Sequence, residues 1–293
     1  MFIATLIAAD RLSVGDISTA EDALAQAGVP AVCRSWIEEG AACDLLLEAG
    51  PGTARVALEG LSGGVDVIVQ AEEGRRKKLL VADMDSTMIT VECIDELADY
   101  AGVKAEVAEV TERAMRGELA FEAALDARVA LLKGLEEAAI DRCRSERVRL
   151  TPGAKCLVRT MRRHGAYSVL VSGGFTRFAE PVAAEIGFDR AVANRLVISD
   201  GRLSGQVDRP IVGAEGKRRA LLDTLAERGL EAADSLAVGD GANDVPMLSE
   251  AGLGVAYHAK PAAADAADAR IDHNDLTALL YAQGYSRSEW EQA

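Results

Sequence analysis

The stretch Leu79-Leu80-Val81-Ala82-Asp83-Met84-Asp85-Ser86-Thr87 decides the fold class of this chain. Its first four residues form a short apolar run bounded by polar residues, which is typical of a strand buried on both faces of a parallel sheet. Polar side chains follow that run directly, and the carboxyl ends of parallel strands are where the site of an α/β fold forms. We therefore interpret residues 79–82 as the first strand of an α/β domain.

Alternating strands and helices fill the chain beyond residue 152. Repeated βα units predict a doubly wound, Rossmann-like parallel sheet. Before them, from about residue 91 to residue 150, charged and alanine-rich periodic stretches predict a helical bundle inserted after the first strand. The elements that we expect are helices at 154–164, 177–186, 217–228 and 244–251, strands at 168–171, 235–238, 254–256 and 269–271, and a β-hairpin at 192–207.

The first 72 residues are predicted to form a small α+β domain of their own. The order βαββαβ, which is the ferredoxin-like signature, comes from strands at 2–8, 31–37, 43–47 and 65–69 and helices at 17–27 and 53–61. In element order and size it resembles the ACT-type small-molecule-binding modules that precede metabolic enzymes; a dimerisation or packing domain explains it equally well. We expect this domain at 1–72 and the catalytic domain at 78–293, with the basic run 75–78 in a solvated linker.

Composition narrows the range of partners. The formal net charge of −15 argues against a nucleic-acid surface, because such surfaces cluster Lys and Arg on one face. No stretch approaches the roughly 18 consecutive apolar residues of a membrane helix. Five cysteines without CxxC spacing, following no secretory signal, indicate reduced thiols in a cytoplasmic protein. We expect a small-molecule substrate, and we consider a homodimer formed through the N-terminal domain.

Three segments place polar groups directly after an apolar strand: residues 83–87, Ser172-Gly173-Gly174 and residues 239–244. In a parallel sheet these strand ends converge on one crevice. Carboxylates packed so closely repel one another, and the usual solution is a hard cation with oxygen ligands. Mg²⁺ fits best, and Asp83 and Asp240 with one backbone carbonyl would suffice to hold it.

Two further groups suit a phosphate ester. Ser172, with the amides around Gly173 and Gly174 at the start of a helix, offers a hydroxyl, N–H donors and a helix dipole. Lys217 heads another helix, where it can neutralise charge on a transferring phosphoryl group. Each signal alone is weak, because a Ser-Gly-Gly turn is usually just a turn and a lysine in a first helical turn is usually solvated.

In this order, the segments resemble the four motifs of the haloacid dehalogenase (HAD) superfamily of phosphohydrolases: Asp-x-Asp-x-Thr at 83–87, Ser172, Lys217 and Gly-Asp-Gly-x-Asn-Asp at 239–244. The resemblance implies a HAD core in which Asp83 is the nucleophile and carries an aspartyl phosphate. It implies that Asp85 first protonates the leaving alkoxide and then activates water. Mg²⁺ would be held by Asp83, the Asp85 carbonyl and Asp240, with Asn243 and Asp244 in supporting roles.

Over residues 76–282 the similarity extends to the phosphoserine phosphatase family. The segments that carry it are Val91-Glu-Cys-Ile-Asp-Glu96, Val110-Thr-Glu-Arg-Ala-Met-Arg-Gly117, Phe121 and Arg128-Val-Ala-Leu-Leu-Lys-Gly134. The resemblance implies a cap in which Glu92 meets the ammonium of phosphoserine and Arg128 its carboxylate, a pairing that suits both charges. Met115 and Phe121 would close over the substrate and exclude water. Without the resemblance, these residues fit a helix-end charge, a surface arginine and two bundle-core side chains.

The expected function is magnesium-dependent hydrolysis of O-phosphoserine to serine and phosphate, the last step of serine biosynthesis. A phosphotransferase that moves the phosphoryl group to another alcohol, such as homoserine, would use the same residues. A non-catalytic amino-acid sensor is the third hypothesis. The intact set of Asp83, Asp85, Lys217 and Asp240 argues against a sensor.

Overall fold

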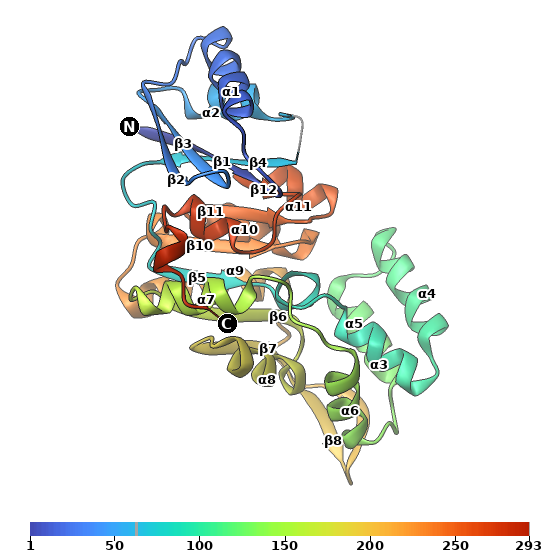
Figure 1. Ribbon diagram of the computed structural model, residues 1–293. Helices are drawn as coiled ribbons and strands as arrows, with labels where there is room; N and C mark the ends of the chain where they lie inside the picture. The colour runs from blue at the N-terminus through green and yellow to red at the C-terminus, as the bar shows by residue number, and fades with distance from the viewer. Residues whose placement is uncertain (62–63, 293) are drawn as a thin grey trace.

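Figure 1 shows a computed structural model of the chain, which describes residues 1–61 and 64–292. An N-terminal domain, drawn at the top, packs on a central α/β domain, and a cap of helices lies on the opposite side, at the lower right. Among the described residues, no helix combines the length and the apolar character that crossing a membrane requires.

The central domain is built on a parallel sheet. Among the described residues, six strands lie in the order β12-β11-β10-β5-β6-β7, and each neighbouring pair is parallel. The strands are β5 (Leu79–Ala82), β6 (Tyr167–Phe175), β7 (Arg190–Asn194), β10 (Ser235–Gly239), β11 (Leu253–Tyr257) and β12 (Ala269–Ile271). This arrangement confirms the predicted doubly wound fold.

Helices cover both faces of this sheet, as the apolar run at 79–82 requires. Leu80 and Ala82 pack with α7 (Ala154–Arg163), α8 (Thr176–Ile186) and α12 (Ala278–Ala282). Leu79 and Val81 point to the other face, because side chains alternate along a strand. There they pack with α9 (Ala214–Arg228), α10 (Val245–Glu250) and α11 (Pro261–Ala266).

The cap is assembled from two separate insertions. The first consists of α3 (Cys93–Ala101), α4 (Lys104–Met115), α5 (Phe121–Leu131) and α6 (Glu137–Arg147). The second is the hairpin of β8 (Leu196–Ser199) and β9 (Arg202–Val207). Backbone hydrogen bonds join the two, from Gly134 N to the Leu203 carbonyl (2.8 Å) and from Leu203 N to the Leu135 carbonyl (2.9 Å).

The predicted hairpin over 192–207 was wrong in its first residues. Residues 192–194 belong to β7, which pairs in parallel with β6 and places Val192 opposite Val171. Only 196–207 form the hairpin. The segment 190–199 is one extended stretch that is shared between two sheets, and strand propensity cannot show where the chain leaves one sheet for the other.

The N-terminal domain confirms the predicted ferredoxin-like order. Its elements are β1 (Phe2–Ala8), α1 (Val14–Gln26), β2 (Cys33–Glu38), β3 (Ala42–Leu47), α2 (Pro51–Leu58) and β4 (Val65–Ala71), and the strands form an antiparallel sheet in the order β2-β3-β1-β4. Both helices pack on one face of this sheet. The likeness to ACT modules stays a prediction.

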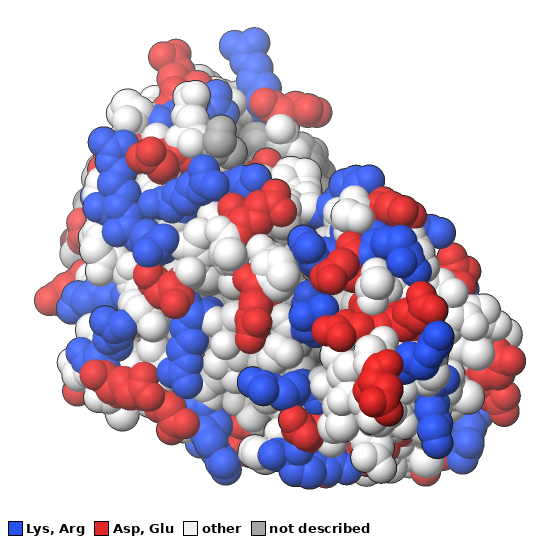
Figure 2. Space-filling view, turned by 90° about the horizontal axis from the view of Figure 1, so that it is seen from below, with Lys and Arg blue, Asp and Glu red and all other residues white. Residues whose placement is uncertain are grey.

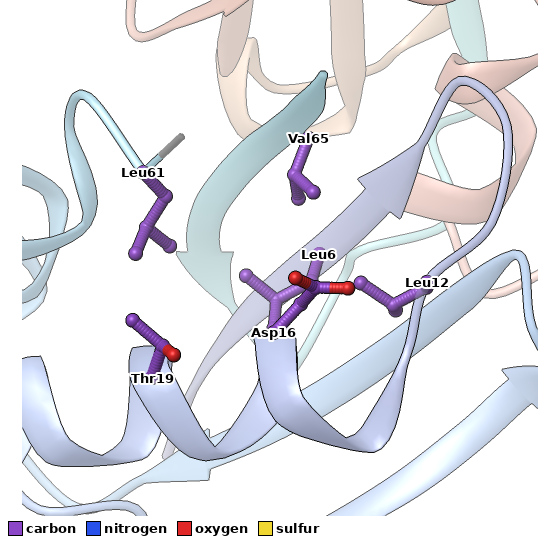
Figure 3. A pocket seen from close by; sticks show the side chains of 6 residues that line it. All are labelled: Leu6, Leu12, Asp16, Thr19, Leu61 and Val65. Atoms are coloured by element: carbon purple, nitrogen blue, oxygen red, sulfur yellow. The ribbon is translucent and has the colours of Figure 1, made fainter. Parts of the chain in front are cut away.

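A small pocket lies between α1 and strands β1 and β4 of this domain (Figure 3). The side chains that line it are Leu6, Leu12, Asp16, Thr19, Leu61 and Val65. Its volume of about 40 Å³ is close to the space that one water molecule takes in the liquid.

The basic run 75–78, predicted to be a solvated linker, is exposed at Arg76 and Lys78, but the prediction was wrong for Arg75 and Lys77. Arg75 Nη1 donates to Asp44 Oδ2 (2.6 Å) in the N-terminal sheet, and Arg75 Nη2 donates to the Ala282 carbonyl (3.1 Å) in the central domain. Lys77 is buried and donates to the Ala233 carbonyl. Arg75 therefore joins the two domains, and Lys77 anchors the segment to the central domain. The partners of both residues are distant in sequence, so the local charge pattern could not reveal them.

Figure 2 shows the molecule from below, with basic and acidic side chains interspersed over that face. Surface ion pairs of the molecule include Arg177 with Glu137 at 2.8 Å and Arg190 with Glu227 at 3.2 Å. Mixed charge of this kind is typical of solvated surfaces.

Candidate active site

The carboxyl edge of the main sheet gathers a buried charge cluster. Asp83 follows β5, Asp240 and Asp244 follow β10, and Lys217 lies in the first turn of α9. Lys217 Nζ lies 2.6 Å from Asp83 Oδ1 and 2.7 Å from Asp244 Oδ1. In the part of the chain that the structure describes, the acidic cluster consists of Asp83, Asp240 and Asp244, whose oxygens lie within 4.8 Å of one another.

Burial and mutual repulsion set the charge states in this cluster. Burial raises the pKa of Asp83 well above its usual range, and the neighbouring Asp244 raises it further, while Lys217 opposes both. For Lys217, burial lowers the pKa, but the two carboxylates outweigh burial and raise it above the usual value. The two carboxylates thus favour the charged form of Lys217.

The donor set of the cluster fits a hard divalent cation. Three carboxylates face one buried ammonium group, and all the donors are oxygens, which Mg²⁺ prefers. Asp244 Oδ2 also accepts from Asp240 N (3.2 Å) and Gly241 N (3.0 Å), so Asp244 is largely occupied in holding the loop and Lys217. Asp83 and Asp240 are left as the carboxylates best placed for a cation.

Asp85 lies outside the acidic cluster and links the core to the cap. Its Oδ1 accepts from Cys93 N at the start of α3 (2.8 Å), and its Oδ2 accepts from Ser172 Oγ (3.0 Å). Burial raises the pKa of Asp85, while the hydrogen bonds from Cys93 and Ser172 lower it. The net rise favours a carboxyl group that can carry a proton.

The phosphate-binding candidates lie in a strand and were wrongly placed at the start of a helix. Ser172, Gly173 and Gly174 are part of β6, and α8 begins only at Thr176. Ser172 Oγ accepts from Gly174 N (2.8 Å) while it donates to Asp85. The apolar pattern that predicts a strand ends before Gly173 and Gly174, because glycine has no side chain to continue it. The backbone nevertheless stays extended through both glycines.

On the cap side, two half-buried charges face the core. Glu92 holds the N-cap position of α3 without a capping hydrogen bond from its side chain, which instead accepts from Ser86 Oγ (2.9 Å). Burial raises its pKa, and Asp85 raises it further. Arg128 on α5 donates from Nε to the Ala124 carbonyl of its own helix (3.3 Å). Burial lowers the pKa of Arg128 and outweighs the opposing effect of the Asp95 and Glu92 carboxylates.

Phe121 packs its ring against two glycines of the core. A β-carbon added to Gly213 would lie 2.9 Å from the ring, and one added to Gly173 would lie 3.2 Å from it. A larger residue at Gly213 would therefore displace the Phe121 ring, and one at Gly173 would crowd it. Met115 is the last residue of α4, and its side chain lies outside the described part of the structure.

Comparison with known proteins identifies the family. Residues 80–249 match the family model of the haloacid dehalogenase-like hydrolases. A phosphoserine phosphatase from Polaromonas sp. is 48% identical over 208 residues, which make up 69% of this chain and 88% of the relative. The chain belongs to the phosphoserine phosphatase family of HAD hydrolases.

Two further matches extend into the N-terminal domain. A phosphoserine phosphatase from Streptomyces coelicolor is 46% identical over 249 residues, covering 84% of this chain and 60% of the relative. The chain thus spans about three fifths of that relative's length. The crystal structure of a probable phosphoserine phosphatase from Vibrio cholerae superimposes with a TM-score of 0.79 at 33% identity, covering 98% of this chain and 88% of that one.

Two residues of the site were missed by the sequence interpretation. Lys260 follows β11; its backbone N donates to the Asp240 carbonyl (2.8 Å) and its Nζ lies 3.2 Å from Asp240 Oδ2. Polar residues after the predicted strand at 254–256 were not considered, although the ends of parallel strands share one edge of the sheet. Asn194, at the end of β7, was absorbed into the predicted hairpin. Asn243 was predicted, and it lies half-buried in the turn Ala242–Asp244 beside Asp240.

Proposed function

We propose that this chain hydrolyses O-phosphoserine to serine and phosphate through an aspartyl phosphate on Asp83. The observation that carries the proposal is the contact of Asp83 with Lys217 inside a buried acidic cluster, with Asp85 two residues away and bridged to the cap. A nucleophile, a proton carrier and a fixed positive charge are the parts that this chemistry needs.

The first step breaks the ester bond. An Asp83 oxygen attacks phosphorus in line, and the bond from phosphorus to the serine oxygen breaks. Asp85 gives its proton to that oxygen, a role to which its raised pKa is suited. Ser172 and the Gly174 amide stand beside Asp85 to hold phosphoryl oxygens, and Lys217 offsets negative charge.

The second step releases phosphate. Asp85, now ionised, takes a proton from water, the water oxygen attacks phosphorus, and the bond to Asp83 breaks, which restores both carboxyl groups. We assign Mg²⁺ to Asp83, Asp240 and the Asp85 carbonyl, with Asp244 and Asn243 in support. When bound, the ion neutralises phosphoryl charge as a Lewis acid.

Substrate choice is assigned to the cap. Glu92 would pair with the ammonium of phosphoserine and Arg128 with its carboxylate, because both are half-buried charges with few protein partners. Phe121 and Met115 would cover the bound molecule. A homodimer through the N-terminal domain and a cytoplasmic location stay predictions from the sequence.

The test is phosphate release with Mg²⁺ from phosphoserine, phosphothreonine and sugar phosphates. We expect kcat/KM for phosphoserine to exceed the others by about 100-fold or more, since a site that pairs buried charges rejects substrates that leave them unpaired. Comparable values would overturn the specificity while leaving a HAD phosphatase. Phosphohomoserine formed in the presence of homoserine would identify a phosphotransferase instead.

A further inference from the structure

Asn194, the last residue of β7, is 2% exposed and uses its whole amide in three hydrogen bonds. Nδ2 donates to the Gly173 carbonyl (2.9 Å) and to the Val212 carbonyl (3.1 Å), and Oδ1 accepts from Val212 N (2.7 Å). One buried side chain therefore binds two backbone segments that lie far apart in the sequence.

The hydrogen bond to the Gly173 carbonyl lies at an irregular part of the sheet. The ladder pairs Val171 with Val192 and then Phe175 with Asn194, so residues 172–174 of β6 lie opposite the single residue Ala193 of β7. A bulge leaves its extra residues without ladder partners. The Asn194 amide supplies the missing donor to the carbonyl in the middle of the proposed phosphate-binding segment.

The bonds to Val212 close the base of the hairpin insertion. The chain leaves the core after Asn194, passes through β8 and β9 in the cap, and returns at Val212. Gly213, the next residue, is in contact range of the Phe121 ring, and α9 with Lys217 begins at Ala214. The same amide thus joins the points where the hairpin departs and returns.

We propose that Asn194 is a positioning residue for the reaction, which fixes the Ser172–Gly174 segment and the second attachment of the cap as one unit. This inference rests on the proposed function. Asn194 acts through Gly173 and Val212 and does not itself touch the substrate. If it serves stability alone, its loss should lower the melting temperature without changing phosphate binding.

The test compares Asn194→Ala with Asn274→Ala. Asn274 is a matched control, because its Nδ2 also donates to two acceptors, the Ile7 carbonyl (3.1 Å) and Asp66 Oδ2 (2.8 Å), but at the contact between the domains. For both variants we would measure Tm, kcat and KM for phosphoserine, and binding of inorganic phosphate from its shift of Tm with Mg²⁺ present.

Asn194→Ala should lose about tenfold or more in kcat/KM, since small displacements of positioning groups are costly, and should bind phosphate several-fold more weakly. Asn274→Ala should stay within about twofold of the wild type in kcat/KM and in phosphate affinity, even if its Tm falls as far as that of Asn194→Ala. Unchanged phosphate binding in Asn194→Ala, or an equal loss in Asn274→Ala, would overturn the proposal. If Asn194→Ala does not fold, Asn194→Ser is compared with Asn274→Ala in the same measurements, because the serine hydroxyl can still form one hydrogen bond.

The phosphate measurement separates this inference from the proposed function. If the wild type fails to hydrolyse phosphoserine but binds phosphate, the substrate assignment is wrong, and the binding comparison between Asn194 and Asn274 still decides the role of Asn194.

Discussion

The core half and the cap half of the site are built in contrasting ways. In the core, Asp83, Asp244 and Lys217 are buried and contact one another at 2.6 and 2.7 Å. In the cap, Arg128 is half-buried and, among the described residues, bonds only to a carbonyl of its own helix, and Phe121 remains 36% exposed. Charged groups that pair with one another hold a fixed geometry, which suits the catalytic step. Charged groups with few protein partners can pair with a substrate that binds and dissociates.

The contrast predicts that core changes abolish turnover and cap changes alter substrate affinity.

Asp83→Asn should lower kcat by roughly 10⁴-fold or more, because the amide is a poor nucleophile and the covalent step is lost. The protein should remain folded, since the asparagine keeps the shape of the side chain. Steady-state phosphate release measures the loss. Asp223→Asn, on an exposed part of α9, is the control and should retain full activity. Substantial turnover by Asp83→Asn would contradict the role of the core.

Removal of divalent ions with EDTA should stop phosphate release, and added Mg²⁺ should restore it, because the acidic cluster then lacks the charge that balances it. Mg²⁺ should also raise the Tm of the wild type, as any ligand of the native state does. An enzyme that keeps full activity after chelation would show that Lys217 alone balances the cluster.

Arg128→Lys should raise the KM for phosphoserine by about tenfold with a smaller change in kcat, because lysine keeps the charge but loses the two-pronged grip on a carboxylate. O-phosphoethanolamine lacks that carboxylate, so its KM should not change. Arg116→Lys, an exposed cap arginine paired with Glu118, is the control. An equal change for both substrates would remove Arg128 from substrate recognition.

Gly213→Ala should have the smallest effect, a rise in KM of about two- to fivefold, because the new methyl group would meet the Phe121 ring at 2.9 Å and displace it. Combining it with Phe121→Leu should recover part of the loss. Gly52→Ala, where a methyl group meets nothing within 4 Å, serves as the control. A KM unchanged in Gly213→Ala would show that the position of Phe121 does not matter.

The core half was predictable from sequence and the cap half only by family resemblance. Asp83, Ser172 and Asp240 could be placed together because strand ends of a parallel sheet share one edge. The positions of Glu92 and Arg128 depend on how the cap helices pack, which no periodicity encodes. The β-hairpin was predicted, but its place in the cap was not, for the same reason.

Contacts between distant residues account for the remaining errors. Arg75 looked like a solvated charge because its partners, Asp44 and the Ala282 carbonyl, are set by domain packing. Asn194 carried no signal either, since its role arises from a bulge that appears only when β6 and β7 are aligned.

The most direct test of the account is to trap the covalent intermediate. During turnover of phosphoserine, borohydride should reduce an aspartyl phosphate to homoserine, and peptide mass spectrometry would locate the change. We predict modification at Asp83 alone, and none in Asp83→Asn. Modification at Asp85 or Asp240, or none at any residue while phosphate is being released, would contradict the assignment of Asp83 as the nucleophile.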